Sequence, residues 1–301
     1  MRKLELSPFV HKVKGQRNWV LCDLLEGRFF QVSPDGDLEM LKKQLLEMKL
    51  VFETGGMIPF KYESSMDLYK KGIRIRELQV RVTGNCDLDC AECGSLCFCF
   101  KSSGEISDET LSFIFEQFKY IPLDQVSIIG GNPMLKFDAI EKIRENLAAE
   151  DFKIMFKGSL DKNEKKILDD LGIKISDFPY QYKEIEEKEM QVDGFSFFFN
   201  QEFNPCWGRK IAVDIDGAIK PCLWSSDILG NIQKDNLKKM INLGDFNPYW
   251  ELTKDKFKEC RICEYRYVCP DCRVAAFKET GDINAKTLPC RYRPQEGKWK
   301  M

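Results

Sequence analysis

The pattern of hydrophobic and polar positions divides the 301-residue chain into three regions. In residues 1–72, apolar segments on both sides of Gly27 predict a β-hairpin over residues 19–32. Apolar residues then recur at helical spacing over residues 38–48 and predict a helix. Two short strands around a Gly-Gly pair predict a second hairpin over residues 50–62.

The second region, residues 73–200, alternates between strand and helix patterns. Strands alternating with helices of this length predict right-handed βαβ units on a parallel sheet. The regular alternation is lost after residue 182, where we still expect one more strand over residues 195–199. The predicted strands are 78–82, 125–129, 152–156 and 173–175, and the predicted helices are 107–120, 137–149 and 161–171.

The third region, residues 201–301, is rich in cysteine and poor in regular apolar pattern. Two short strands around Asp216-Gly217 predict a hairpin over residues 211–222. A region of this kind buries too little apolar surface to be stable alone, and bound metal would supply its stability. The sequence therefore predicts an α/β protein with three domains, at 1–72, 73–200 and 201–301.

Composition limits the location and the partners. A formal net charge of −2 gives no reason to expect nucleic-acid binding. The N-terminal residues lack the apolar core of a signal peptide, and no stretch approaches the ~20 apolar residues of a membrane span. We therefore expect a cytoplasmic protein, in which thiols stay reduced and clustered cysteines indicate metal or catalysis instead of disulfides.

The chain has thirteen cysteines and a single histidine. Histidine-ligated zinc catalysis is therefore not expected, and His11 is predicted to lie on the surface. Cys22 lies in the first predicted hairpin and is predicted to be a core residue. The remaining cysteines lie mainly in two spaced arrays, which points to metal binding because thiolates hold iron–sulfur clusters or zinc.

The first array is Cys86-x3-Cys90-x2-Cys93, in a loop that follows a predicted strand. Three thiolates can hold three irons of a [4Fe–4S] cluster, and the fourth iron is then open to a small molecule. Zinc is the alternative, because structural zinc takes four ligands and Cys97 or Cys99 could supply the last one. These two cysteines could equally be hydrogen donors to a substrate radical, or buried apolar residues.

The second array has seven members. A zinc ribbon is again the alternative, but such a ribbon separates its two cysteine pairs by ~15–20 residues. Here only five residues separate the pairs, which favours iron–sulfur clusters. The members are Cys206, Cys222, Cys260, Cys263, Cys269, Cys272 and Cys290.

The first array resembles the signature of radical S-adenosylmethionine (SAM) enzymes. The next strand ends in Gly130-Gly131-Asn132-Pro133, which is similar to the family's Gly-Gly-Glu-Pro segment beside the methionine moiety of SAM. The resemblance implies that Cys86, Cys90 and Cys93 hold a catalytic [4Fe–4S] cluster that chelates SAM. It also implies that Gly130, Gly131 and Asn132 contact SAM, and that an external one-electron reductant is a partner.

The second array resembles a SPASM domain, the C-terminal module of radical SAM peptide maturases. This resemblance implies two auxiliary [4Fe–4S] clusters. One would be held by Cys260, Cys263, Cys269 and Cys290, and the other by Cys206, Cys222 and Cys272. The fourth ligand of the latter cluster stays open.

The N-terminal region resembles winged-helix-like leader-recognition units of peptide-modifying enzymes, which bind a leader peptide as an added strand. Only 112 residues separate Cys93 from Cys206, so the implied radical SAM barrel is shortened. The implied function is the radical-based modification of a ribosomally synthesised precursor peptide, by a thioether, a carbon–carbon link or epimerisation. The alternative is an inactive iron–sulfur scaffold that binds the peptide for a partner enzyme, and a zinc-binding adaptor is a further one.

Overall fold

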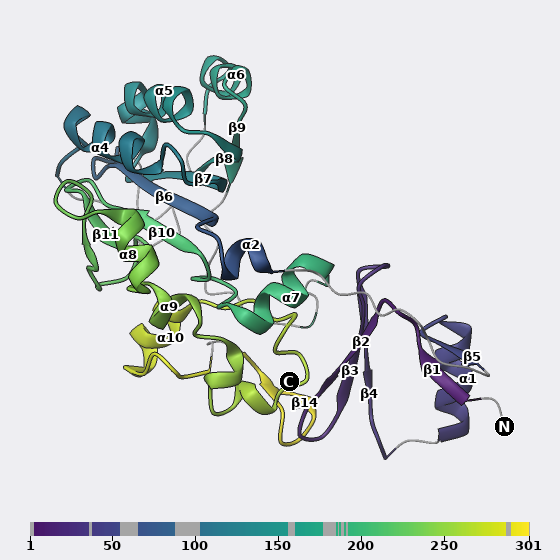
Figure 1. The fold of residues 1–301 in the computed structure, drawn as a ribbon. Helices are drawn as coiled ribbons and strands as arrows, with labels where there is room; N and C mark the ends of the chain where they lie inside the picture. Colours follow the sequence, from purple (N-terminus) through teal and green to yellow (C-terminus); the bar gives the residue numbers. More distant parts are fainter. Residues whose placement is uncertain are drawn as a thin grey trace. The chain divides into compact units, whose positions relative to one another are not determined.

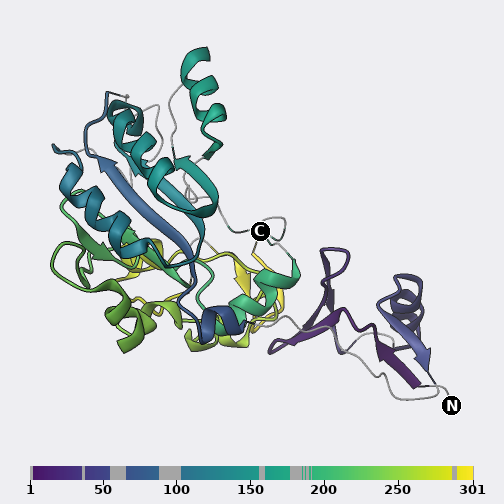
Figure 2. The same cartoon turned by 45° about the horizontal axis from the view of Figure 1, so that its top comes forward.

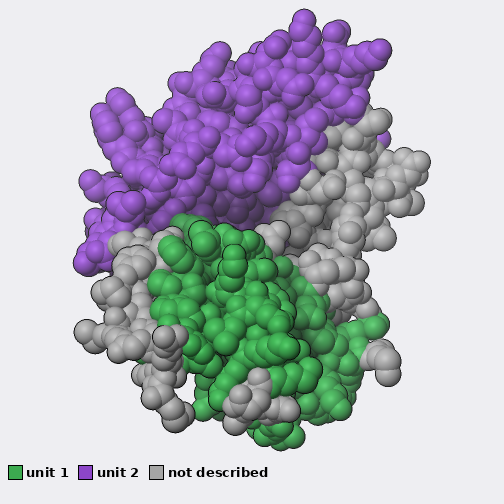
Figure 3. All heavy atoms as spheres, turned by 90° about the vertical axis from the view of Figure 1, so that its right-hand side faces the viewer, with its two compact units in different colours: residues 1–66, 183–206, 251–301 green, residues 67–182, 207–250 purple. Residues whose placement is uncertain are grey.

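The computed structural model divides the chain into two compact units, each made of separate segments (Figures 1 and 3). The first unit comprises residues 1–66, 183–206 and 251–301, and the second comprises 67–182 and 207–250. The predicted division into three consecutive domains stays a prediction. The residues that the structure describes are 3–35, 38–54, 66–87, 103–155, 160–176, 185, 187, 190, 192–286 and 290–300.

The second unit is built on a seven-stranded, mostly parallel sheet, as the alternating pattern predicts. Its strand order is β12-β11-β10-β6-β7-β8-β9, so β12 and β9 are its edges among the described residues. Strands β10 and β6 to β9 are parallel, and β11 and β12 are antiparallel to their neighbours. The strands are β6 (Ile75–Thr83), β7 (Leu123–Gly130), β8 (Ala149–Met155), β9 (Ile173–Ser176), β10 (Lys210–Val213), β11 (Ala218–Lys220) and β12 (Gly230–Asn231).

Helices connect the parallel strands, which confirms the predicted βαβ units. Helix α4 begins after Ser107, whose hydroxyl accepts from the Thr110 amide at 3.1 Å. Helix α6 begins with a complete capping box between Asp161 and Glu164. The helical segments of this unit are α2 (Asp67–Lys70), α4 (Asp108–Phe118), η1 (Pro133–Lys136), α5 (Phe137–Asn146), α6 (Lys162–Asp170), α8 (Leu237–Leu243) and α9 (Asn247–Trp250).

The first unit is an assembly of small sheets and short helices. Strands β2, β3 and β4 form an antiparallel sheet, which confirms the hairpin predicted around Gly27. Helix α1 confirms the helix predicted over residues 38–48. The elements are β1 (Lys3–Leu6), β2 (Val10–Lys14), β3 (Trp19–Asp23), β4 (Arg28–Val32), α1 (Leu38–Glu47), β5 (Val51–Thr54), α7 (Gly194–Glu202), η3 (Lys254–Lys256), η4 (Cys260–Ile262), α10 (Arg273–Thr280), β13 (Tyr292–Arg293) and β14 (Lys298–Trp299).

The core of the first unit joins segments that are far apart in the sequence. Val20 and Cys22 pack in one buried cluster with Phe197, Tyr265 and Tyr292. The prediction that Cys22 is a core residue is therefore confirmed. No helix in the described parts of the chain is long and apolar enough to cross a membrane.

The strand predicted over residues 195–199 is wrong, because these residues lie in helix α7 (Figures 1 and 2). The Asp193 carboxylate accepts from the Ser196 amide at 2.8 Å and caps the helix. Phe195 and Phe199 then stack one turn apart, with ring centroids 5.3 Å from each other. The phenylalanine run favours a strand by propensity, and the cap overrides that preference.

One further expectation needs correction, and one stays untested. His11 is buried, with 7% of its surface exposed, because its ring packs against the rings of Phe197 and Phe198 at 5.2 Å. Strand β5, the first strand of the second predicted hairpin, pairs with β1. The second strand predicted for that hairpin, 58–62, lies outside the described residues.

Candidate functional site

The start of the predicted SAM-cluster loop lies at the carboxyl end of strand β6. Cys86 follows this strand by three residues and is half-buried. Cys90, Cys93, Cys97 and Cys99 lie outside the described residues, so only the first member of this array is placed. Carboxyl ends of parallel strands are where open α/β sheets bind their ligands.

The Gly-Gly-Asn segment after β7 lies directly against this loop. The Gly131 amide donates to the Thr83 carbonyl at 2.9 Å, and the Asn132 amide donates to the Asn85 carbonyl at 2.8 Å. A Cβ atom on Gly131 would clash with Asn85 and would lie 2.8 Å from the Cys86 Cβ atom. Gly131 is therefore required for the close approach of the two loops.

Asn132 holds the cysteine loop through its side chain. Its Nδ2 donates to Asp87 Oδ1 at 2.7 Å, and its Oδ1 accepts from the Met134 amide at 3.1 Å. Only 7% of the residue is exposed. Among the described residues, the contacts of Asn132 thus fix Asp87 and the first turn of η1, and a contact of Asn132 with SAM stays a prediction.

A row of buried polar residues on the sheet was missed by sequence reasoning. Glu77 Oε2 pairs with Lys210 Nζ at 2.8 Å, and Glu77 Oε1 accepts from Ser127 and Gln79 at 2.8 and 3.0 Å. Burial disfavours the Glu77 carboxylate, but Lys210, Arg76 and Gln79 together outweigh this effect and the pKa of Glu77 is lowered to about 2. The signal in the sequence was the alternation of Glu77, Gln79 and Arg81 with apolar residues.

Cys222 belongs to the second unit and lies beside this polar row. It follows β11, is 3% exposed, and precedes Leu223, whose amide donates to Gln79 Oε1 at 3.2 Å. The structure therefore attaches this predicted cluster ligand to the central sheet. The other two members of its predicted set, Cys206 and Cys272, belong to the first unit.

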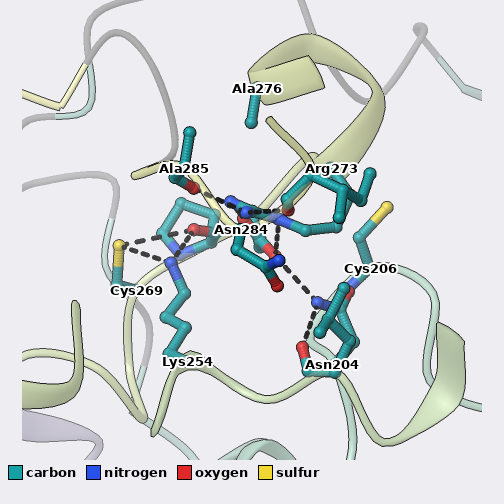
Figure 4. Close-up of polar contacts among 12 residues, drawn as sticks. Asn204, Cys206, Lys254, Cys269, Arg273, Ala276, Asn284 and Ala285 are labelled. Carbon is teal, nitrogen blue, oxygen red and sulfur yellow. Dashed lines mark hydrogen bonds and ion pairs between the residues drawn. The ribbon is translucent and has the colours of Figure 1, made fainter. Parts of the chain in front are cut away.

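A hydrogen-bonded chain connects the backbone around Cys206 and Cys272 within the first unit. The Cys206 amide donates to Asn204 Oδ1 at 2.9 Å, and Asn204 Nδ2 donates to Asp271 Oδ2 at 2.8 Å. Asp271 and Arg273 form a fully buried ion pair at 2.5 Å (Figure 4). Cys272 lies between these two charged residues, so its backbone is held on both sides.

The first unit contains a pocket of about 390 Å³, including its opening to solvent. Four of its lining residues are the cysteines that the resemblance assigns to one auxiliary cluster. Two lysines, Lys254 and Lys286, lie in the same wall. The four cysteines are Cys260, Cys263, Cys269 and Cys290.

Burial raises the pKa of all four thiols in this pocket. The positive charge of Lys254 opposes this effect at Cys260, Cys269 and Cys290, and Lys286 opposes it at Cys290. Among the described residues, no three His, Cys, Asp or Glu side chains are grouped closely enough to hold a single metal ion. The donor set consists of thiols, which are the natural ligands of iron–sulfur clusters.

Comparison with known proteins gives matches of limited extent. No family model matches the chain. One curated relative, the AdoMet-dependent heme synthase of Methanosarcina barkeri (strain Fusaro / DSM 804), is 30% identical over 78 residues. The match spans 26% of this chain and 22% of the relative. AdoMet is S-adenosylmethionine.

Three solved structures are similar at low sequence identity. SuiB of Streptococcus suis bound to precursor peptide SuiA is 13% identical, with a TM-score of 0.44, and the match covers 96% of this chain and 99% of SuiB. The anSMEcpe structure with bound AdoMet and a peptide is 12% identical, with a TM-score of 0.45. The match covers 69% of this chain and 92% of the anSMEcpe chain. BtrN in an open conformation is 18% identical, with a TM-score of 0.42. The match covers 63% of this chain and 92% of the BtrN chain.

All of these relatives are radical SAM enzymes. The structural likenesses have TM-scores below one half, so they carry no argument about substrate or site. The resemblance predicted from the first cysteine array and the Gly-Gly segment is confirmed: the chain is similar to radical SAM enzymes.

Proposed function

We propose that this protein is a radical SAM enzyme that cleaves SAM reductively and uses the resulting radical to modify a ribosomally synthesised precursor peptide. The observation that carries the proposal is the packing of the Cys86 loop against Gly131 and Asn132 at the carboxyl ends of β6 and β7. When bound, SAM and its [4Fe–4S] cluster supply the 5′-deoxyadenosyl radical. The chain's own residues hold the cysteine loop in place for this chemistry.

The proposed ligands of the SAM cluster are Cys86, Cys90 and Cys93. Asn132 holds the Asp87 side chain of this loop and, through its amide, the Asn85 carbonyl, and Gly131 allows the two loops to approach. We further propose that Gly130, Gly131 and Asn132 form the methionine end of the SAM site. The polar row around Glu77 and Lys210 offers charged groups on the same sheet.

The proposed auxiliary clusters follow the two cysteine sets. The pocket residues Cys260, Cys263, Cys269 and Cys290 would hold one of them. In a cubane each cysteine binds its own iron, so its four sulfurs lie further apart than the ligands of a single ion. The pocket's four thiols and its two lysines support such a cluster, because it carries net negative charge. Cys206, Cys222 and Cys272 are proposed for the other cluster.

The proposed domain roles complete the assignment. Residues 1–72 would form the winged-helix-like unit that binds the leader peptide, 73–200 the shortened radical SAM barrel, and 201–301 the SPASM domain. The resemblance of the second cysteine array to the SPASM domains of peptide maturases supports a peptide substrate. We place the protein in the cytoplasm, because its many thiols need a reducing compartment.

Anaerobic reconstitution and product analysis test this proposal. We expect about twelve irons per chain, and formation of 5′-deoxyadenosine from SAM with dithionite. Replacement of Cys86, Cys90 and Cys93 by alanine should remove about four irons and abolish the product. Cys22→Ala is the matched control, because Cys22 lies outside both cysteine arrays. This variant should keep the full iron content and form the product.

The two measurements also distinguish the competing functions. Product formation by the triple variant would refute the assignment of the first array. Iron in the auxiliary sites without 5′-deoxyadenosine in the wild-type protein would indicate the inactive scaffold. Zinc in place of iron would indicate the adaptor.

A further inference from the structure

Lys254 is a buried lysine in the wall of the cysteine pocket. Only 1% of its surface is exposed. Its Nζ donates to Cys269 Sγ at 3.3 Å and to the Pro270 carbonyl at 2.8 Å. Figure 4 shows the side chain pointing from its own segment, η3, toward Cys269. The ammonium therefore lies beside a proposed cluster ligand.

The cost of burying this ammonium calls for a compensating charge. Removing an ammonium from water is costly unless a partner offsets the loss of hydration. A thiol and a carbonyl, the groups to which Lys254 donates, carry no full negative charge. The lysine thus suits a pocket that becomes negatively charged.

A [4Fe–4S] cluster with four thiolate ligands would make the pocket negatively charged. Its net charge is negative, and it becomes more negative by one unit when it accepts an electron. Positive charge and N–H···S hydrogen bonds near a cluster stabilise the reduced form more than the oxidised form. A buried ammonium exerts this effect strongly, because little solvent screens it.

We propose that Lys254 is a positioning residue that raises the reduction potential of the cluster held by Cys260, Cys263, Cys269 and Cys290. It acts through its hydrogen bond to Cys269 and through its charge. The cluster accepts one electron from an external one-electron reductant, and no bond to Lys254 forms or breaks. This inference rests on the proposed ligand set, and it assigns the pocket a specific role as an electron acceptor.

A redox titration followed by electron paramagnetic resonance tests the proposal. The background for the titration is the full-length protein with Cys86, Cys90 and Cys93 replaced by alanine, which lacks the signal of the SAM cluster. The signal of the pocket cluster is identified as the one that disappears when Cys260 and Cys263 are also replaced by alanine. Dithionite is the reductant, and the midpoint potential is the measured quantity.

In this background, Lys254→Met should weaken electron binding at least tenfold, which lowers the midpoint potential by about 59 mV for a one-electron couple. Lys254→Arg keeps the positive charge and should shift the potential less. Lys256→Met is the matched control, because Lys256 lies in the same segment, η3, and is exposed. Its potential should equal that of the parent protein.

An unchanged midpoint potential in Lys254→Met overturns the proposal. If this variant loses the irons of the pocket, Lys254→Gln is measured instead, since its amide keeps a donor and lacks the charge. An unchanged potential in that variant, or loss of the same irons from it, would show that Lys254 serves assembly and would also overturn the proposal. A wild-type protein that binds the pocket cluster and forms no 5′-deoxyadenosine refutes the proposed enzyme while leaving this titration valid.

Discussion

Two buried lysines show how differently the two units balance charge. Lys210 in the second unit is 4% exposed and pairs with the Glu77 carboxylate at 2.8 Å. Lys254 in the first unit is 1% exposed and donates to the Cys269 thiol and the Pro270 carbonyl. The first lysine meets a full negative charge within the protein, and the second meets a carbonyl and a thiol, of which the thiol becomes a negatively charged thiolate when it binds metal.

This difference indicates where each unit obtains its stability. The second unit has a continuous sheet with an apolar core, of which Ile129, Met155 and Ala212 are buried members on three different strands. The first unit surrounds a cysteine pocket with short 3₁₀ segments and short loops. We therefore expect the first unit to depend on iron and the core of the second unit to be independent of it.

Removal of iron should have the largest effect and should separate the two units. Metal binding in small loop-rich regions supplies folding free energy on the order of 10 kcal/mol. Amide hydrogen exchange after chelation should therefore become fast around η4 and α10. Strands β6 and β7 should keep their protection. Equal loss of protection in both units would contradict the comparison.

The next largest effect should follow from breaking the buried pair in the second unit. Lys210→Met leaves the Glu77 carboxylate buried without its ammonium partner and should lower the free energy of unfolding by ~3–5 kcal/mol. Denaturant unfolding measures the change. Lys174→Met is the control, because its ammonium, which pairs with Asp151 at 2.8 Å, is exposed and the pair should contribute about 0–1 kcal/mol.

The pair of Glu77 and Lys210 should also make the stability of the second unit fall at acid pH. The pKa of Glu77 is lowered from 4.5 to about 2, so its stabilising contribution is complete above about pH 4.5. That contribution should be lost as the pH falls toward 2, at a cost of ~3 kcal/mol. Unfolding followed from pH 6 to 2 measures it, and Glu77→Gln should remove most of this dependence.

The smallest effect should come from a helix cap in the second unit. Asp161→Ala removes the acceptor for the Glu164 amide at 2.8 Å and should cost about 1 kcal/mol. Because this cap lies in the unit whose core is expected to be independent of iron, the cost should be the same before and after chelation. Thermal unfolding in both states measures it, and an iron-dependent cost would weaken the comparison.

The regular part of the fold could be predicted because its rules are local. Helices α4 and α6 begin at Ser107 and Asp161, where the sequence places strong caps. The pairing of strand β5 with β1 was missed because it joins residues that are distant in the sequence. The placement of β10 beside β6 likewise depends on contacts across more than 100 residues, and spacing along the chain does not encode it.

The site could be predicted where chemistry dictates the residue type. The four pocket cysteines come together in the structure as a set that the sequence resemblance already grouped. Lys254 was missed, because Lys254 and Lys256 are chemically identical in the sequence and only packing distinguishes the buried one. Gly131 was expected to face SAM, while its described close contacts are with Asn85 and Cys86.

The interleaving of segments has a consequence for how the chain is made. Gln31, which is synthesised early, donates hydrogen bonds to Glu264 and to Tyr292, at 3.0 and 2.8 Å. Those partners leave the ribosome more than 200 residues later, so the native contacts of the N-terminal sheet must wait for them. We expect nascent chains to remain dependent on chaperones until late in translation, with iron loading as a step after release.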